Sequence, residues 1–161
     1  MKKNKFIKIF KIIFIVYCIV LIYILFLCRS RVGNVWGIKT FSKEHIDGMT
    51  NFIPFVTIKN YYNHINSGIL NSKIIFENLV ANILMFIPMG ILLPILYKDK
   101  FNKLWKILLF IIVLVLLIEF IQFVTFTGSA DVDDLTLNTL GCLIGYSITK
   151  IKSLRKFLHL D

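Results

Sequence analysis

The stretch ILLFIIVLVLLIEFIQFVTF, residues 107–126, decides the fold, because it is long, apolar and holds one charged side chain, Glu119. A helix that crosses the hydrocarbon core of a bilayer needs about 20 mostly apolar residues. Apolar segments of similar character lie on both sides of this stretch, and the last of them is shorter. The sequence predicts an all-α membrane protein, a four-transmembrane-helix bundle that forms a single integral membrane domain over residues 1–161. The expected helices cover about residues 6–28, 74–97, 107–126 and 135–149.

The composition of the whole chain agrees with this prediction. Hydrophobic residues make up 57% of the sequence, whereas soluble domains have about 45–50%. Only 17% of the residues are charged, yet the net charge is +10. These values argue against a soluble enzyme, a disordered basic tail and a nucleic-acid binder. We therefore expect no nucleic acid among the partners.

The basic residues are distributed unevenly between the two sides of the predicted bundle. Thirteen of the 19 Lys and Arg residues lie in the N-terminal segment, in the 98–106 loop or in the C-terminal tail, and six lie between residues 29 and 73. Basic residues accumulate in cytoplasmic loops. A signal peptide also begins basic and then turns apolar, but no small-residue cleavage site follows residue 28. We therefore expect a retained first helix and a multi-pass protein of the bacterial cytoplasmic membrane, with both termini inside.

Polar side chains within the spans gather toward the outer ends of the predicted helices. Asn78 and Asn82 are four residues apart, and Glu119 and Gln122 are three apart, so each pair shares one helix face. Polar groups in hydrocarbon usually face the bundle interior or a wet cavity. The sequence predicts one outward-opening polar site. Its candidate ligand-binding residues are Asn78, Asn82, Gln122, Asp133 and Asn138, and its candidate catalytic residues are Glu119, Asp131 and Asp134.

Each of these residues also has a structural interpretation. The asparagines can form hydrogen bonds between helices. Asp133 or Asp134 can cap the N-terminus of the last helix. Glu119 can be protonated and bonded to Gln122.

Three further residues indicate helix packing rather than chemistry. Gly141 and Gly145 form a G-x-x-x-G pattern, which is typical of close contact with another helix. Pro88 removes a backbone donor from the second predicted helix, so we expect a kink there and a packing role for this residue.

Motifs for common cofactors and metals are missing from the sequence. There is no G-x-S-x-G, no H-E-x-x-H and no P-loop. The run from Asp131 to Asp134 lacks the spacing of a calcium-binding loop. We therefore expect no cofactor and no resident metal ion.

The spacing of the polar and small residues resembles the VanZ-like family of bacterial membrane proteins. The similarity covers about residues 50–148 and includes the element Asn51-x2-Pro54-Phe55 before the second predicted helix. The family takes its name from a protein associated with low-level resistance to teicoplanin, a lipoglycopeptide antibiotic, so the resemblance implies a role in the cell envelope. The matching residues are Asn78, Asn82, Phe86, Pro88, Gly90, Glu119, Gln122, Gly128, Asp131, Asp134, Asn138, Gly141 and Gly145.

Three hypotheses for function follow. In the first, the polar site binds a lipid-linked cell-wall precursor or the lipoglycopeptide itself at the outer leaflet, and so lowers susceptibility to such antibiotics. In the second, Glu119 and the aspartates act as acid and base on a lipid-linked envelope substrate. In the third, the chain is a scaffold whose last helix packs on a partner through Gly141 and Gly145. Beyond the lipid bilayer itself, the oligomeric state stays open.

Overall fold

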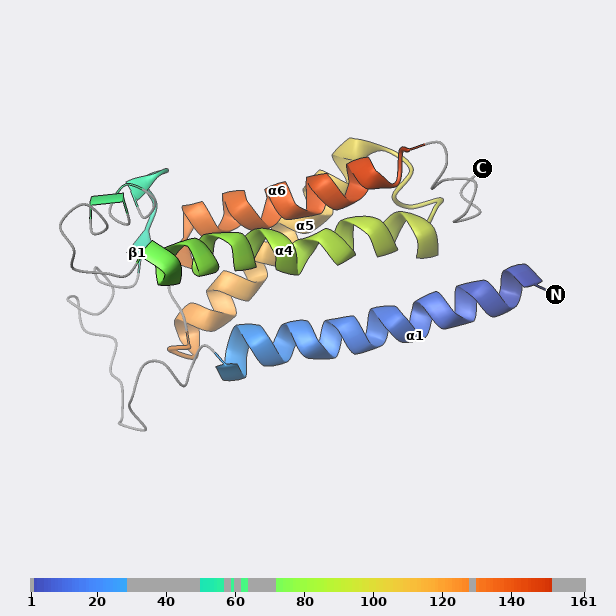
Figure 1. Cartoon of the computed structure of the whole chain (residues 1–161), viewed down its shortest axis with the longest axis horizontal. Helices are drawn as coiled ribbons and strands as arrows, with labels where there is room; N and C mark the ends of the chain where they lie inside the picture. Colours follow the sequence, from blue (N-terminus) through green and yellow to red (C-terminus); the bar gives the residue numbers. More distant parts are fainter. Residues whose placement is uncertain are drawn as a thin grey trace.

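The computed structural model describes residues 2–28, 50–56, 59, 62–63, 72–127 and 130–151. These residues form four long helices and a short two-stranded sheet (Figure 1). The elements in chain order are α1 (Lys2–Ile22), the π-helix η1 (Tyr23–Cys28) that continues it, β1 (Thr50–Asn51), α4 (Ser72–Leu96), α5 (Leu104–Val124), β2 (Ala130–Asp131) and α6 (Val132–Ile148).

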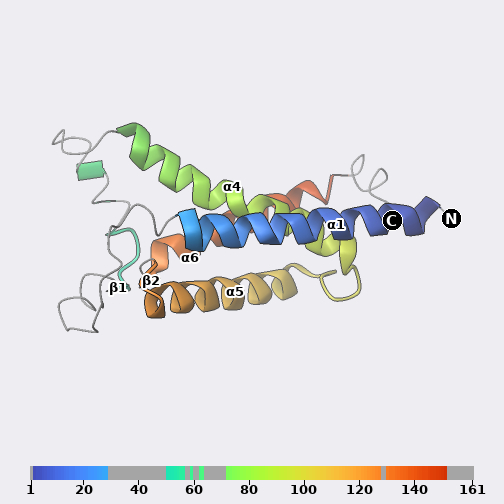
Figure 2. The same ribbon diagram turned by 90° about the horizontal axis from the view of Figure 1, so that it is seen from below.

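The helices run along the long axis of the molecule and form a bundle (Figures 1 and 2). Helices α4 and α6 lie side by side and form the most extensive helix pair. The start of α1, the end of α6 and the connection between α4 and α5 lie at one end of the bundle. Strands β1 and β2 lie at the other end, which we call the strand end.

Three of the helices are long and apolar enough to cross a membrane. The segments are Phe6–Leu27, Leu79–Leu96 and Leu104–Val124. Helix α6 has 17 residues and, at a rise of 1.5 Å per residue, is about 25 Å long. It is therefore close to the thickness of a hydrocarbon core, about 30 Å.

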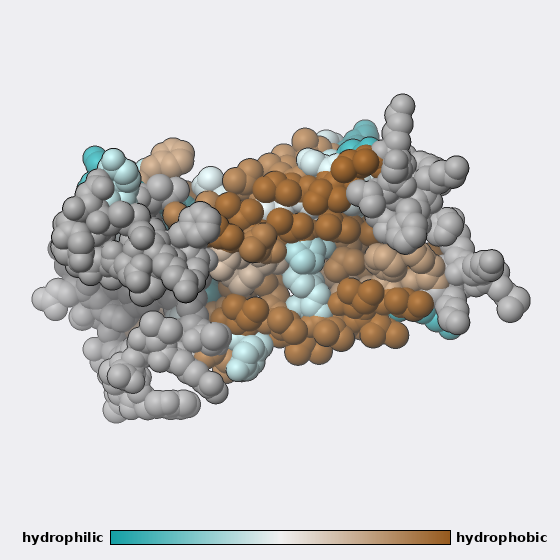
Figure 3. Space-filling view, in the orientation of Figure 1, coloured by the Kyte–Doolittle hydropathy of each residue, from teal (hydrophilic) through white to brown (hydrophobic). Residues whose placement is uncertain are grey.

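The outer surface of the bundle is apolar between its two ends. Large hydrophobic side chains are exposed on α1 and α5, among them Ile12, Ile19, Leu109 and Phe120. Figure 3 shows this band of hydrophobic residues across the middle of the molecule. In water such a surface favours aggregation, whereas lipid tails solvate it well. The surface is that of a membrane protein.

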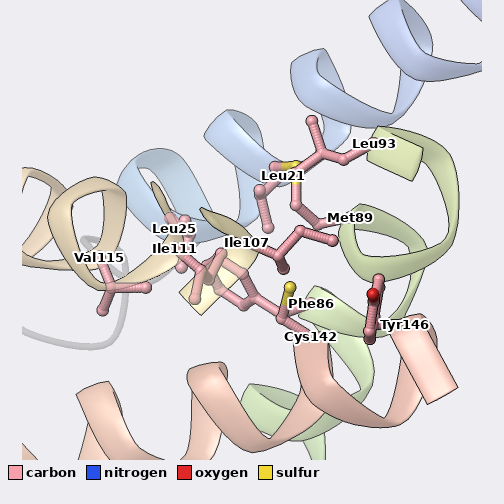
Figure 4. Close-up of a cluster of buried hydrophobic side chains, with 10 residues drawn as sticks. All are labelled: Leu21, Leu25, Phe86, Met89, Leu93, Ile107, Ile111, Val115, Cys142 and Tyr146. Carbon is pink, nitrogen blue, oxygen red and sulfur yellow. The ribbon is translucent and has the colours of Figure 1, made fainter. Parts of the chain in front are cut away.

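The centre of the bundle is a compact apolar core. Phe86 of α4, Ile107, Ile111 and Val115 of α5, and Cys142 of α6 are completely buried. Leu21 of α1 and Leu25 of η1 close the core from the fourth side (Figure 4). All four helices therefore contribute to one packed interior.

Glycines allow α4 and α6 to approach closely. A Cβ atom at Gly141 would overlap the carbonyl oxygen of Ile83, and one at Gly145 would overlap that of Ile87. On the other helix, a Cβ atom at Gly90 would overlap the carbonyl oxygen of Cys142. The backbones thus meet directly, as small residues permit. The glycine pair lies against α4 of the same chain, so it is not open to a partner helix as the scaffold hypothesis requires.

Helix α4 continues through both of its prolines. Pro88 and Pro94 lie inside the helix, and Pro88 leaves the carbonyl of Leu84 without its helical donor. In the next residue, Met85, the carbonyl oxygen accepts a 2.7 Å hydrogen bond from the Tyr17 hydroxyl of α1. Pro88 itself is half-buried and directly follows Ile87, which contacts Gly145.

The helices begin a few residues earlier than the apolar pattern suggests. Helix α4 starts at Ser72 and α6 at Val132, and α5 starts at Leu104 and ends at Val124. The added first turns hold polar residues, such as Lys73, Lys106 and Asp133, which are helical but do not belong to an apolar pattern. Beyond α5 the chain turns at Phe126, whose φ of 56° is incompatible with a continuing helix.

Candidate functional site

The three carboxylates at the start of α6 bind three different parts of the chain. The Asn51 side-chain amide donates to Asp131 Oδ1 at 3.1 Å, and the Phe55 backbone N–H donates to Asp133 Oδ1 at 2.6 Å. The Asn82 amide of α4 donates to Asp134 Oδ1 at 2.5 Å. These hydrogen bonds join a loop, α4 and α6 at the strand end. We call Asn51, Asn82, Asp131, Asp133 and Asp134 the polar cluster.

The N-cap of α6 is Asp131, so the assignment of this role to Asp133 or Asp134 is wrong. Asp131 has an extended backbone, and its Oδ1 accepts the backbone N–H of Asp133 at 2.9 Å. The reason is the β2 strand, which holds residues 130–131 extended and so sets the start of the helix. Asp133 and Asp134 lie in the first turn, where the helix dipole stabilises negative charge.

Strand pairing holds the loop that follows β1 against the start of α6. β1 and β2 are parallel, with Thr50 opposite Ala130 and Asn51 opposite Asp131. The Asn51 side-chain oxygen also accepts the backbone N–H of Ile53 at 3.2 Å, which is an Asx-type turn. Asn51 therefore shapes its own loop and connects it to Asp131.

Most of the polar cluster is buried. Asp133 is only 2% exposed, and Asp131 and Asn82 are also buried. Their hydrogen bonds satisfy polar groups that would otherwise be costly to bury. Chemically, the cluster is a set of ionisable acceptors held rigidly by protein donors.

Two other predicted site residues lie on α5. Glu119 and Gln122 are both buried. The Gln122 amide donates to the carbonyl oxygen of Leu25 in η1 at 2.9 Å. Gln122 thus connects α5 to the π-helical end of α1, and none of the polar cluster's hydrogen bonds described above involves Glu119.

Asn138 lies on α6, one turn beyond Asp134. It is 6% exposed, and its side-chain oxygen has no hydrogen-bond partner among the described residues. The side chain of Asn78 lies outside the described part of the structure, as does Gly128. The structure therefore brings Asn82 together with the three aspartates. It places Glu119 and Gln122 at buried positions of α5, and Asn138 at a buried position of α6.

Sequence reasoning missed two participants in the polar cluster. Asn51 of β1 and the backbone N–H of Phe55 in the following loop lie about 80 residues along the chain from the aspartates that they bind. The only available signal was the Asn51-x2-Pro54-Phe55 element of the family resemblance. Among the described residues, no three His, Cys, Asp or Glu side chains are grouped so that they could hold a metal ion.

The apolar bundle and the polar cluster at its end define a helical membrane protein. The chain belongs to the VanZ/LLP1 family, whose model matches residues 14–153. This match extends further toward the N-terminus than the similarity seen in residues 50–148, and it includes the second part of α1 and all of η1. No curated protein and no solved structure matches the chain.

Proposed function

We propose that this VanZ/LLP1 protein lowers susceptibility to lipoglycopeptide antibiotics such as teicoplanin, by engaging a lipid-linked or surface ligand at its strand end. In this proposal α6 is a fourth span, both termini are cytoplasmic and the strand end faces outward. The single observation that carries it is the polar cluster, in which Asp131, Asp133 and Asp134 gather Asn51, Phe55 and Asn82 at one end of the spans.

The geometry supports binding better than catalysis. The cluster's carboxylates are occupied by protein donors, so they shape a surface rather than present a nucleophile and its base. In this proposal the ligand contacts groups next to the polar cluster, which the cluster holds in place. These groups are residues 50–55 and the turns of α4 and α6 nearest the strand end. A lipid-linked ligand would meet polar groups and apolar helix faces at the same level of the membrane.

Drug susceptibility tests this proposal directly. A deletion strain complemented with the wild-type gene should tolerate more teicoplanin than the deletion strain alone. Asp134→Ala should lose this tolerance, because it removes the acceptor that holds Asn82. Thr136→Val is the matched control, since its exposed hydroxyl donates to the Val132 carbonyl on its own helix.

The susceptibility assay needs two further comparisons. Membrane levels of each variant are measured by blotting, and a glycopeptide without a lipid tail is tested in parallel, for which no change is expected. If Asp134→Ala protects as well as the wild type at equal membrane level, the polar cluster has no role in this activity.

A product assay separates binding from the enzyme alternative. Purified protein is incubated with lipid-linked cell-wall precursor, with Mg²⁺ or with a chelator, and the lipid is analysed by mass spectrometry. We expect measurable affinity and unchanged lipid. A new product that Glu119→Gln abolishes would instead favour an enzyme that uses Glu119 with Asp131, Asp133 and Asp134.

A further inference from the structure

The loop that follows β1 presents apolar side chains outward from the strand end. Phe52 is 75% exposed, Ile53 is 66% exposed and Phe55 is 64% exposed, and Pro54 between them is also exposed. These four residues, which we call the apolar tip, carry no charge. Four adjacent exposed apolar residues are unusual where a surface faces only water.

The apolar tip is held in a defined shape. Phe55 has a φ of 66°, a left-handed conformation that a bulky side chain rarely adopts. The Phe55 N–H donates to Asp133, and the Ile53 N–H donates to Asn51, which itself bonds to Asp131. The hydrogen bonds to the polar cluster therefore fix the backbone on either side of the tip, while the side chains remain outside.

The height of the apolar tip along the bundle indicates which surroundings its side chains meet. Asp131 and Asp133 are the N-cap and first turn of α6, so the tip lies level with the end of the apolar band that α6 and its neighbours form. For a bundle that spans a bilayer, the end of the apolar band corresponds to the boundary between lipid tails and headgroups. Aromatic residues concentrate at this boundary, and long basic side chains reach from it to the lipid phosphates.

The residues that follow the tip have the same character. The Lys59 N–H donates to the Phe55 carbonyl at 2.9 Å, so Lys59 lies one turn from Phe55, and its side chain is exposed. Tyr62 is exposed as well. Phe52, Phe55 and Tyr62 with Lys59 have the composition of a membrane-interface anchor.

We propose that the apolar tip inserts into the interfacial region of the bilayer at the strand end, with Asp131 and Asp133 holding it in the inserting conformation. The partner surface is the lipid headgroup region of the membrane that the chain spans. This inference rests on the membrane placement in the proposed function but not on antibiotic protection. The two can therefore fail separately.

Fluorescence quenching by brominated lipids tests the insertion. The full-length chain, with Trp36→Phe and Trp105→Phe, receives Phe52→Trp as its single tryptophan and is reconstituted into vesicles that contain anionic lipid. Lipid brominated near the headgroup should quench this tryptophan more than lipid brominated near the chain end. A matched probe, Leu116→Trp on the lipid-facing side of α5, should show the reverse order.

Three results would overturn the proposal. Strong quenching by aqueous acrylamide without quenching by either lipid would place the tip in water. Quenching by neither lipid nor acrylamide would mean that protein covers it. Stronger quenching by lipid brominated near the chain end would place it in the hydrocarbon core rather than at the interface.

A second pair of variants tests the role of Asp133. Asp133→Asn keeps a side-chain oxygen that can accept the Phe55 N–H, whereas Asp133→Ala removes it. In the Phe52→Trp background, Asp133→Ala should weaken lipid quenching and increase acrylamide quenching, and Asp133→Asn should leave both unchanged. The Leu116→Trp probe in the Asp133→Ala protein confirms that the bundle is still inserted. If Asp133→Ala shows the same lipid and acrylamide quenching as the Phe52→Trp protein with Asp133 intact, Asp133 does not hold the tip.

Discussion

Asp131, Asp133 and Asp134 lie within four residues of one another, yet each binds a different segment. Asp131 binds Asn51, Asp133 binds the backbone of Phe55, and Asp134 binds Asn82. A hydrogen bond to a charged group contributes about 1.5–3 kcal/mol in water-soluble proteins, and polar contacts between membrane helices average about 0.6 kcal/mol. Asp134 lies in the first turn of α6, whereas Asn82 lies within the apolar segment Leu79–Leu96 of α4, so we expect the strength of their bond to fall between these two values.

A double-mutant cycle on Asn82 and Asp134 measures this bond. We expect Asn82→Ala and Asp134→Ala to show a coupling free energy of about 1 kcal/mol, because each variant alone leaves a partner unsatisfied. Unfolding in mixed detergent micelles supplies the free energies. The cycle between Asn82 and the lipid-facing Leu140 is the control, with no coupling expected. Additive effects for Asn82 and Asp134 would contradict the contact.

The packing of α4 against α6 depends on glycines of each helix that lie against the backbone of the other. Gly141 and Gly145 of α6 lie against carbonyl groups of α4, and Gly90 of α4 lies against a carbonyl group of α6. Rotation of a side chain cannot relieve an overlap between a Cβ atom and a backbone carbonyl. The two helices must therefore separate if any of these glycines acquires a side chain.

Alanine at Gly141 should destabilise the protein despite its better helix propensity. Alanine is favoured over glycine by about 1 kcal/mol in a helix, but overpacking costs about 1–3 kcal/mol and more where backbone must move. We expect a net loss of about 2 kcal/mol, measured by unfolding in mixed micelles. Leu140→Ala, on the exposed face of the same helix, should have little effect. Equal stability of Gly141→Ala and the wild type would mean that the helices are further apart than described.

Viewed as a whole, the molecule has two chemically different ends. Residues of the α4–α5 connection, including Lys98, Lys100 and Lys103, are exposed at the end opposite the polar cluster. Acidic and amide side chains gather at the strand end. The distribution of charge along the sequence predicts that the basic end faces the cytoplasm.

Cysteine labelling in intact cells tests this orientation. In a background with Cys18, Cys28 and Cys142 replaced by alanine, a membrane-impermeant maleimide should label Asn63→Cys, because that residue is exposed and precedes α4, which begins at the strand end. Lys100→Cys should react only after the cells are lysed. Labelling of both variants in lysed cells controls for expression. The opposite pattern in intact cells would reverse the proposed topology.

The sequence by itself determined the helical membrane class, because the length and apolar content of a span are local properties of the chain. It also determined the family, through the spacing of residues such as Asn82, Pro88 and Gly141. Only the tertiary structure decided that Asn51 meets Asp131, that Asp131 rather than Asp133 or Asp134 caps α6, and that Gly141 and Gly145 face α4 of the same chain. The Asn51 and glycine contacts join segments about 50–80 residues apart, and helical periodicity assigns a residue to a face without identifying what lies opposite that face. The cap is a local contact, but Asp131 is extended there because β2 pairs with the distant strand β1.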